Sequence, residues 1–337
     1  MQTILDGDGH ILESDGVQDY LEPAYRRNAY RDHFPLDGWN RNMGGRLGST
    51  TVRSAQTWLQ GLELGGMSQA VLFPTLGLFS GFIRNRDVAV ALCRAYNSFV
   101  AEQYRDVDAR LQPVALLPVQ DPAEAVKELR RAVNELKLVG AMLVADGAHP
   151  LLGDERYHPL YAAAQELDTT LAIHASGSHL GGAGVDLFPQ FIHTHTVSHP
   201  FGIMRQLTSY VFDGIPDRFP KLRMAFLEAG VTWVPYWMDR MDEEYEKRGA
   251  VEAPHLRRKP SEAISGGTIF FSMESGESLL PQALDKVGED HVIYASDYPH
   301  WDNEYPESVH HLRSRSDISE ARKTKLFETN TRRLFKL

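Results

Sequence analysis

The stretch that decides the fold of this chain is Asp290-His291-Val292-Ile293-Tyr294-Ala295-Ser296-Asp297-Tyr298-Pro299-His300. Its β-branched and aromatic core ends in a carboxylate, and the next residues turn away through a proline. This pattern predicts a buried strand over 291–296 with Asp297 at its C-terminal tip. In a (β/α)8 barrel, catalytic groups stand at such strand tips. The other strands decide whether further groups converge on Asp297.

Strand-like and helical segments alternate along the rest of the chain. Such alternation indicates parallel βαβ units of an α/β protein, and eight units favour a closed (β/α)8 TIM barrel over an open doubly wound sheet. The predicted strands span residues 3–8, 69–73, 111–117, 140–144, 169–173, 222–227, 268–272 and 291–296. The predicted helices span 52–64, 84–106, 122–136, 157–167, 199–213, 231–247 and 278–287, and two C-terminal helical segments, 305–314 and 317–335, follow.

The length of 337 residues exceeds the usual range for one domain, but α/β barrels with insertions reach this size. We therefore expect one barrel domain over 1–337. Residues 19–51 are polar, rich in Gly and Arg, and longer than an ordinary connection between a strand and a helix. Because this segment leaves the C-terminal end of the first strand, it is expected to be a loop insertion that folds over the barrel mouth.

Composition limits the partners of the chain. The formal net charge of −10, without a clustered basic stripe, argues against nucleic acid or an anionic membrane surface as the main partner. The first residues do not resemble a secretion signal, and no apolar run approaches the length of a membrane span, so a cytoplasmic location is expected. The one cysteine, Cys93, lies in an apolar helical pattern that predicts a buried structural thiol.

Four of the predicted strands end in side chains that bind metals or transfer protons. These are Asp8 and His10 on the first strand, His174 on the fifth, Glu228 on the sixth and Asp297 on the eighth. Parallel strands bring all their C-terminal ends to one rim of a barrel, and positions i and i+2 of a strand share one face. Imidazoles with carboxylates and no thiolate suit Zn²⁺ or Mn²⁺. Each residue alone is commonly structural, but together they predict a metal site with Asp8, His10, His174 and Asp297 as ligands.

Several motifs carry a resemblance. They are Asp6-Gly7-Asp8-Gly9-His10-Ile11-Leu12-Glu13, Ile173-His174, the run 214–223 leading into Phe226-Leu227-Glu228-Ala229-Gly230, and Tyr294-Ala295-Ser296-Asp297-Tyr298-Pro299-His300. The chain resembles the amidohydrolase-related family of the amidohydrolase superfamily, the group of aminocarboxymuconate-semialdehyde and γ-resorcylate decarboxylases. The resemblance implies a distorted barrel with one divalent metal ion. The donor types favour Zn²⁺ as this ion, with Mn²⁺ possible.

The chain departs from the family pattern at two positions. The first ligand, His or Glu in the family, is Asp8, which is still an oxygen donor. The histidine that the family has on its sixth strand is Glu228. A carboxylate cannot donate a hydrogen bond unless it is protonated, but it can act as a base or hold a water molecule.

Three functions remain open at this point. The first is a metal-dependent, non-oxidative decarboxylase of an aromatic or unsaturated carboxylic acid, in which Asp297 delivers the proton and Glu228 orients it or relays a proton. The second is a metal-dependent hydrolase of an amide, a lactone or a C–C bond next to a carbonyl, in which Asp297 takes a proton from a metal-activated water. The third is a barrel that only binds a ligand.

Other residues give weaker signals. His199 opens the predicted helix 199–213 and serves either as a catalytic group at the mouth or as a cap. His179 is a candidate substrate contact, His300 a group that orients Asp297, and Glu13 and Trp233 are weak candidates for the substrate site or its surroundings. No glycine fingerprint for a nucleotide or flavin follows the first strand. A small carboxylic acid as substrate and a homodimer are expected.

Overall fold

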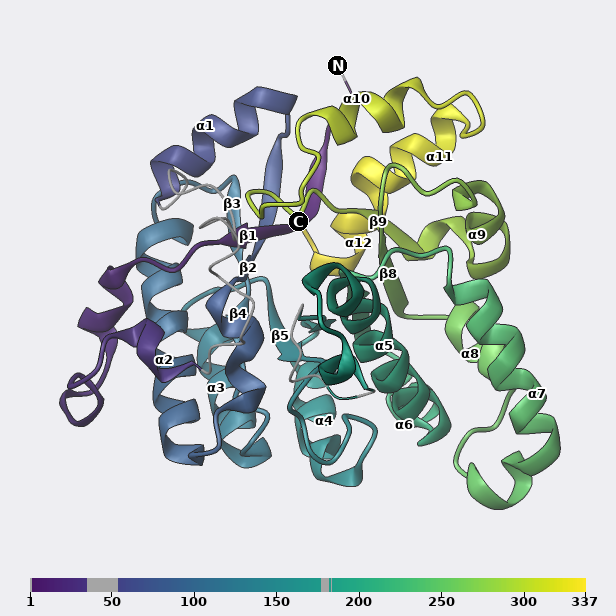
Figure 1. The fold of residues 1–337 in the computed structure, drawn as a ribbon, viewed down its shortest axis with the longest axis horizontal. Helices are drawn as coiled ribbons and strands as arrows, with labels where there is room; N and C mark the ends of the chain where they lie inside the picture. The colour runs from purple at the N-terminus through teal and green to yellow at the C-terminus, as the bar shows by residue number, and fades with distance from the viewer. Residues whose placement is uncertain (1, 35–53, 177–181, 183) are drawn as a thin grey trace.

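The computed structural model describes residues 2–34, 54–176, 182 and 184–337. Parallel strands occupy the centre of the molecule, and helices lie around them (Figure 1). This arrangement confirms the predicted α/β fold class. The strands are β1 Leu5–Ile11, β2 Gln69–Pro74, β3 Leu111–Pro113, β4 Ala115–Leu116, β5 Gly140–Val144, β6 Thr170–His174, β7 Arg223–Leu227, β8 Ile269–Met273 and β9 Val292–Tyr294.

The strands form two sheets, in the order β1-β2-β3 and β4-β5-β6-β7-β8-β9. The two sheets meet where Val114 interrupts the predicted strand 111–117, and the Val114 amide donates to the carbonyl of Leu72 at 3.0 Å. At the other seam the chain after β9 lies along β1. There the Asp297 amide donates to the Asp8 carbonyl at 3.0 Å, and the His10 amide donates to the Tyr298 carbonyl at 2.8 Å. These backbone bonds, in place of regular strand pairing, give the barrel its distortion.

The helices surround the strands and mostly follow the predicted order. They are α1 Ala55–Gly65, α2 Arg86–Val100, α3 Pro122–Asn134, α4 His158–Glu166, α5 Phe191–Phe212, α6 Ile215–Arg218, α7 Val234–Glu252, α8 Pro260–Ser265, α9 Leu280–Val287, α10 Glu307–Ser314, α11 Glu320–Thr324 and α12 Asn330–Phe335. Caps fix some of their starts: Asp121 accepts hydrogen bonds from the amides of Ala123 and Glu124, and Pro122 is the first residue of α3.

The predicted start of the helix at His199 was wrong. Helix α5 begins at Phe191 and contains Pro200 in its interior, so His199 lies in the middle of the helix. A proline usually marks the start of a helix because it has no amide hydrogen to donate. Here the turns before it are anchored by buried side chains, and the hydroxyl of Thr194 donates to the Val185 carbonyl at 3.2 Å. This anchoring lets the helix run through the proline.

The described part of the predicted loop insertion over residues 19–51 contains short turns of 3-10 helix. Short 3-10 helices span Asp15–Tyr20, Pro23–Tyr25 and Tyr30–His33. Buried Tyr30 and Phe34 pack against each other with ring centroids 5.1 Å apart, which orders this part of the segment. Residues 35–51 lie outside the described residues, and the expectations of a cover over the mouth and of one domain over 1–337 stay predictions.

The C-terminal helix covers the end of the barrel where the strands begin. The Leu334 carbonyl accepts hydrogen bonds from the hydroxyl of Thr170 and, at 2.7 Å, from the guanidinium of Arg223. Phe335 reaches inward to the fully buried Phe73, with ring centroids 6.5 Å apart. The barrel interior is therefore filled from this end, and the opposite rim is left for the polar side chains.

Two smaller expectations can also be compared with the described residues. Cys93 is fully buried, as predicted for a structural thiol, and burial raises the pKa of its thiol well above the ordinary range. Among the described helices, none is both long and apolar enough to cross a membrane.

Candidate metal and acid-base site

The strand ends bring the predicted ligands together. Asp8 and His10 come from β1 and His174 ends β6, while Glu228 directly follows β7 and Asp297 stands three residues after β9. Donor atoms of Asp8, His10 and His174 lie within 4.8 Å of one another, and those of His10, Glu228, Asp297 and His300 form a second such group. His10 belongs to both groups, so the two groups form one cluster.

Backbone carbonyls fix how two of the histidines present their nitrogens. His10 Nδ1 lies 3.2 Å from the Pro74 carbonyl, and His174 Nδ1 lies 2.9 Å from the Ala175 carbonyl. A carbonyl only accepts, so each Nδ1 carries hydrogen and each Nε2 keeps a lone pair when the ring is neutral. His174 Nε2 lies 3.1 Å from Asp8 Oδ1, and His10 Nε2 lies 3.3 Å from Asp297 Oδ1. Both rings are thus arranged as metal ligands.

Unpartnered atoms test whether a cation fits this cluster. Among the described residues, His10 Nε2, Glu228 Oε2 and Asp297 Oδ1 are buried and make no hydrogen bond of regular geometry. Their close neighbours are other groups of the same cluster, because Glu228 Oε2 lies 3.1 Å from His174 Nδ1 and Asp297 Oδ1 lies 2.6 Å from His300 Nδ1. Buried polar atoms almost always make hydrogen bonds, so three such atoms in one place fit a site that a cation would complete. Burial also lowers the pKa of His10 well below the ordinary range, which keeps the ring neutral. Neutral imidazole and carboxylate oxygens suit a divalent cation.

Two of the side chains are held on strained backbone. Glu228 has φ of 62° and Asp297 has φ of 53°, the left-handed region that side-chain-bearing residues rarely adopt. Such conformations cost about 1–3 kcal/mol each and cluster at functional sites. Their side chains are 15% and 20% exposed, whereas the side chain of Asp8 is 3% exposed. The strained residues therefore form the part of the cluster that solvent or a substrate can reach.

Burial and neighbouring charges separate the pKa values of the two carboxylates. Considering the protein groups alone, burial raises the pKa of Asp297 to about 7, although His300 opposes this rise. Burial acts in the same direction on Glu228, but His174 and His199 outweigh it and hold the pKa of Glu228 well below its ordinary range. A pair of acids with diverging pKa values is typical of acid-base chemistry, with Asp297 as the acid and Glu228 as the ionised group.

Two of the weaker predicted candidates, His300 and His199, lie in the cluster or at its edge. His300 Nδ1 lies 2.6 Å from Asp297 Oδ1, so this histidine is part of the cluster. His199 Nε2 lies 3.8 Å from Glu228 Oε2, at the edge of the cluster.

Two other candidates, Glu13 and Trp233, are not brought into the cluster. Glu13 does not reach it directly and binds the amides of Thr75, Leu76 and Gly77. Trp233 is turned to other partners, because its indole nitrogen donates to the Gly230 carbonyl at 3.0 Å. His179 lies outside the described residues.

Asp6 is a positioning residue that the sequence reasoning did not single out. Its Oδ1 accepts hydrogen bonds from the amides of Ser296 at 2.9 Å and Asp8 at 3.2 Å, and its Oδ2 accepts from the Ser296 hydroxyl. One fully buried carboxylate therefore joins the segment of Asp8 to the segment of Asp297. The alternation Asp6-Gly7-Asp8-Gly9-His10 contains the signal, because Asp6, Asp8 and His10 are spaced by two along a strand.

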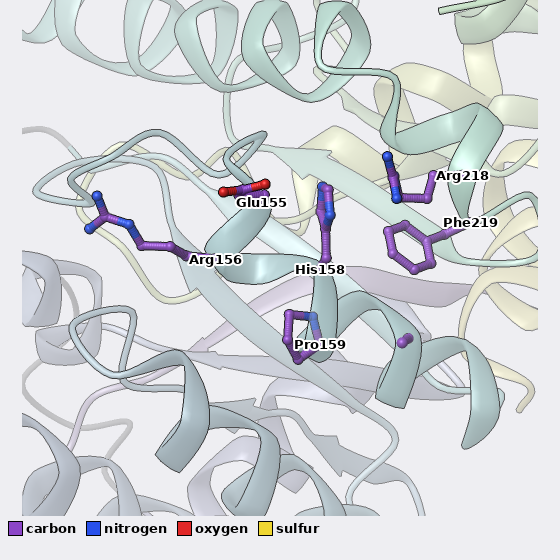
Figure 2. A pocket seen from close by; sticks show the side chains of 7 residues that line it. Glu155, Arg156, His158, Pro159, Arg218 and Phe219 are labelled. Atoms are coloured by element: carbon purple, nitrogen blue, oxygen red, sulfur yellow. The ribbon is translucent and has the colours of Figure 1, made fainter. Parts of the chain in front are cut away.

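A separate pocket lies on the outside of the barrel, at the start of α4 (Figure 2). Figure 2 shows that its lining combines charged groups with the ring of Phe219, which lies 5.6 Å from the His158 ring. It is lined by Glu155, Arg156, His158, Pro159, Ala162, Arg218 and Phe219. None of the strand-end residues belongs to it, and the candidate chemistry is therefore assigned to the rim cluster.

Comparison with known proteins gives the class of this chain. A family model described as Amidohydrolase matches residues 74–337. The chain therefore belongs to the amidohydrolase family of enzymes, which confirms the prediction from the motifs.

Two relatives differ in their reactions. The chain is 27% identical over 272 residues to a γ-resorcylate decarboxylase of a Rhizobium strain, covering 76% of this chain and 79% of the relative. It is 25% identical over 291 residues to a 2-keto-4-carboxy-3-hexenedioate hydratase of a Sphingobium strain, covering 80% of this chain and 79% of the relative.

A solved structure has the same fold. The 5-carboxyvanillate decarboxylase of Novosphingobium aromaticivorans, complexed with manganese and 4-hydroxy-3-methoxy-5-nitrobenzoic acid, superimposes with a TM-score of 0.77 at 20% identity. The match covers 100% of this chain and 96% of the other. The similarity supports the distorted barrel expected from the sequence.

Proposed function

We propose that the protein is a metal-dependent, non-oxidative decarboxylase of an aromatic carboxylic acid. The observation that carries this proposal is the convergence of Asp297, whose pKa burial raises to about 7, with the metal-ligand atoms of Asp8, His10 and His174 at one rim of the strands. Such a site offers a proton and a cation to one bound molecule. The γ-resorcylate decarboxylase among the relatives supports an aromatic acid as substrate.

The candidate ligands of the cation are Asp8, His10, His174 and Asp297. When bound, the ion supplies positive charge that fixes a substrate carboxylate and stabilises developing negative charge. Manganese accompanies the N. aromaticivorans decarboxylase, and zinc was favoured by the sequence, so these two ions are the candidates. Both accept imidazole and carboxylate ligands.

Asp297 is the proton donor in the proposed reaction. It gives its proton to the ring carbon that bears the carboxylate, the C–C bond breaks, its electron pair returns to the ring, and carbon dioxide leaves. Asp297 then regains a proton from solvent, which reaches its 20% exposed side chain. Glu228, ionised beside His174 and His199, adds negative charge that helps keep the proton on Asp297. His199 is the weakest of the three proposed catalytic groups, because it contacts Glu228 alone among them.

A hydrolase remains the alternative, and one observation favours it. Glu228 is ionised and its Oε2 is buried without a hydrogen bond of regular geometry, although it lies 3.1 Å from His174 Nδ1, and such a carboxylate suits the holding of a water molecule. The hydratase among the relatives is an enzyme whose reaction also uses water. In this reading Asp297 takes a proton from the water that attacks a carbonyl, and a cation held by Asp8, His10 and His174 would supply the positive charge that makes this water more acidic.

A panel of substrates separates the two reactions. The protein, loaded with Mn²⁺ or Zn²⁺, is incubated with hydroxybenzoic acids, with enoic and β-keto acids, and with lactones and amides. We expect carbon dioxide from an aromatic acid and none with Asp297→Asn. Hydrolysis of a lactone or amide without carbon dioxide from any acid would replace the proposal with the alternative.

The remaining parts of the proposal concern the setting of the enzyme. A homodimer, a cytoplasmic location and one barrel domain over 1–337 are carried over from the sequence as predictions. Sedimentation at several protein concentrations tests the first of them.

A further inference from the structure

His300 is held differently from the other two histidines of the cluster. His10 and His174 each direct one nitrogen at a backbone carbonyl, which can only accept. His300 Nε2 instead lies 3.1 Å from the hydroxyl of Thr75, a group that donates or accepts. The ring of His300 can therefore keep this bond in either tautomer, while the rings of His10 and His174 cannot.

The turn that carries Thr75 is fixed by a carboxylate. Glu13 accepts hydrogen bonds from three consecutive amides, those of Thr75 at 3.1 Å, Leu76 at 2.8 Å and Gly77 at 2.9 Å. The preceding residue of the turn, Pro74, supplies the carbonyl that binds His10. One pinned turn therefore sets the orientation of two histidines, and Thr75 itself is buried.

The other edge of the His300 ring faces the acid. Nδ1 lies 2.6 Å from Asp297 Oδ1 and 3.7 Å from Glu228 Oε1. The ring stacks on His10 with centroids 3.8 Å apart and planes 26° apart. Stacking holds the plane of the ring but permits a flip that would turn carbon instead of Nδ1 toward Asp297. The hydrogen bond to Thr75 favours the orientation with Nδ1 toward the acid.

We propose that Thr75, on the turn pinned by Glu13, is a positioning residue that holds His300 with Nδ1 against Asp297. The expected effect of Thr75 on turnover rests on the proposed decarboxylation, whereas its contact with His300 does not. The hydroxyl contacts the edge of the ring opposite to the one that faces Asp297, so the two contacts together fix the orientation of the ring. A methyl group in its place would remove the hydrogen bond at Nε2 that opposes the flip, and only the contacts of Nδ1 would then oppose it.

Substitution of Thr75 tests this role. Thr75→Val keeps the shape and removes the hydroxyl, whereas Thr75→Ser keeps the hydroxyl. The matched control is Thr170→Val, at a buried threonine whose hydroxyl bonds the Leu334 carbonyl at the opposite end of the barrel. For each variant kcat, KM, the metal content by elemental mass spectrometry and the crystal structure are determined.

We expect Thr75→Val to lower kcat by at least about tenfold with KM and metal content near wild type, because truncation affects the reacting geometry and not ground-state binding. Thr75→Ser and Thr170→Val should turn over like wild type. In crystals the contact between His300 Nδ1 and Asp297 should persist in the serine variant and be lost in the valine variant.

Two results would overturn the inference. One is a valine variant that keeps the His300 contact, and the other is a serine variant that falls as far as the valine variant. Failure of the wild-type protein to decarboxylate any acid would instead refute the proposed function, and the crystal structures would still decide the role of Thr75.

Discussion

Removal of the Asp6 carboxylate should destabilise the protein and loosen the metal site together. Asp6 is fully buried and accepts hydrogen bonds from two amides and one hydroxyl, which Asp6→Ala would leave without their partner. A buried donor left unpaired costs about 1–3 kcal/mol, so for these three donors we expect a loss of roughly 3–9 kcal/mol. This is a large part of the about 5–15 kcal/mol that stabilises a typical domain.

The control for this prediction is Asp6→Asn. Burial raises the pKa of Asp6 to about 7, so part of the molecules already carry a neutral group there at neutral pH. The asparagine oxygen can still accept from the amides of Ser296 and Asp8, and the variant should lose less than about 2 kcal/mol. Unfolding in urea, with chelator present, gives the free energies of unfolding of all three proteins.

The metal site supplies the second measurement on these variants. Because Asp6 joins the backbone of Asp8 to that of Ser296, next to Asp297, the alanine variant should also bind Mn²⁺ or Zn²⁺ more weakly in competition with a chelator. An Asp6→Ala protein as stable as wild type would refute the reasoning, since three buried donors would then have found other partners at no cost.

Three further predictions follow from the same site and its surroundings. Asp297→Asn should lower the rate of carbon dioxide release by roughly 10²–10⁴-fold, which is the contribution of a positioned acid. The control Asp290→Asn, just before β9, should leave the rate unchanged. Similar rates for both variants would contradict the role of Asp297. Metal at about a hundredfold excess over its dissociation constant should stabilise the protein by roughly 2.7 kcal/mol, and calorimetry with and without chelator that shows no shift would exclude a resident ion. Burial raises the pKa of Asp146 from 3.8 to about 6. The stability that its protonated form contributes is therefore full below about pH 4 and is lost as the pH rises through about 6. Over this range the free energy of unfolding should fall by roughly 3 kcal/mol. Asp146→Asn should lack this loss, and a difference in unfolding free energy between the two proteins that stays constant from pH 4 to pH 7 would be inconsistent with it.

The sequence predicted the features that depend on local patterns. Buried strands read as apolar runs, and each run that ends in a ligand-type residue placed it correctly at the rim, as for His174 and Glu228. The i and i+2 rule also holds for Asp8 and His10, whose Oδ1 and Nε2 atoms lie 3.8 Å apart. The parallel strands then brought these groups together without further information.

The features that depend on contacts between distant segments could not be predicted. Asp6 bonds Ser296, and Thr75 bonds His300, across 290 and 225 positions of the chain. Nothing in the local pattern of Thr75 distinguishes it from other residues that follow a strand. The start of α5 was missed for a related reason, because the anchors that carry the helix through Pro200 are tertiary contacts.

Isotope labelling of the product with deuterium and ¹⁸O tests most directly whether the protein is a decarboxylase with Asp297 as the proton donor. The aromatic acid that turns over fastest is incubated with the metal-loaded enzyme in D₂O, and in a parallel reaction in ¹⁸O-labelled water. Decarboxylation with Asp297 as proton donor predicts carbon dioxide and a product with one deuterium on the carbon that carried the carboxylate, without ¹⁸O in the ring product. A product that contains ¹⁸O and no deuterium at that carbon, formed without carbon dioxide, would contradict the account and identify a hydrolase.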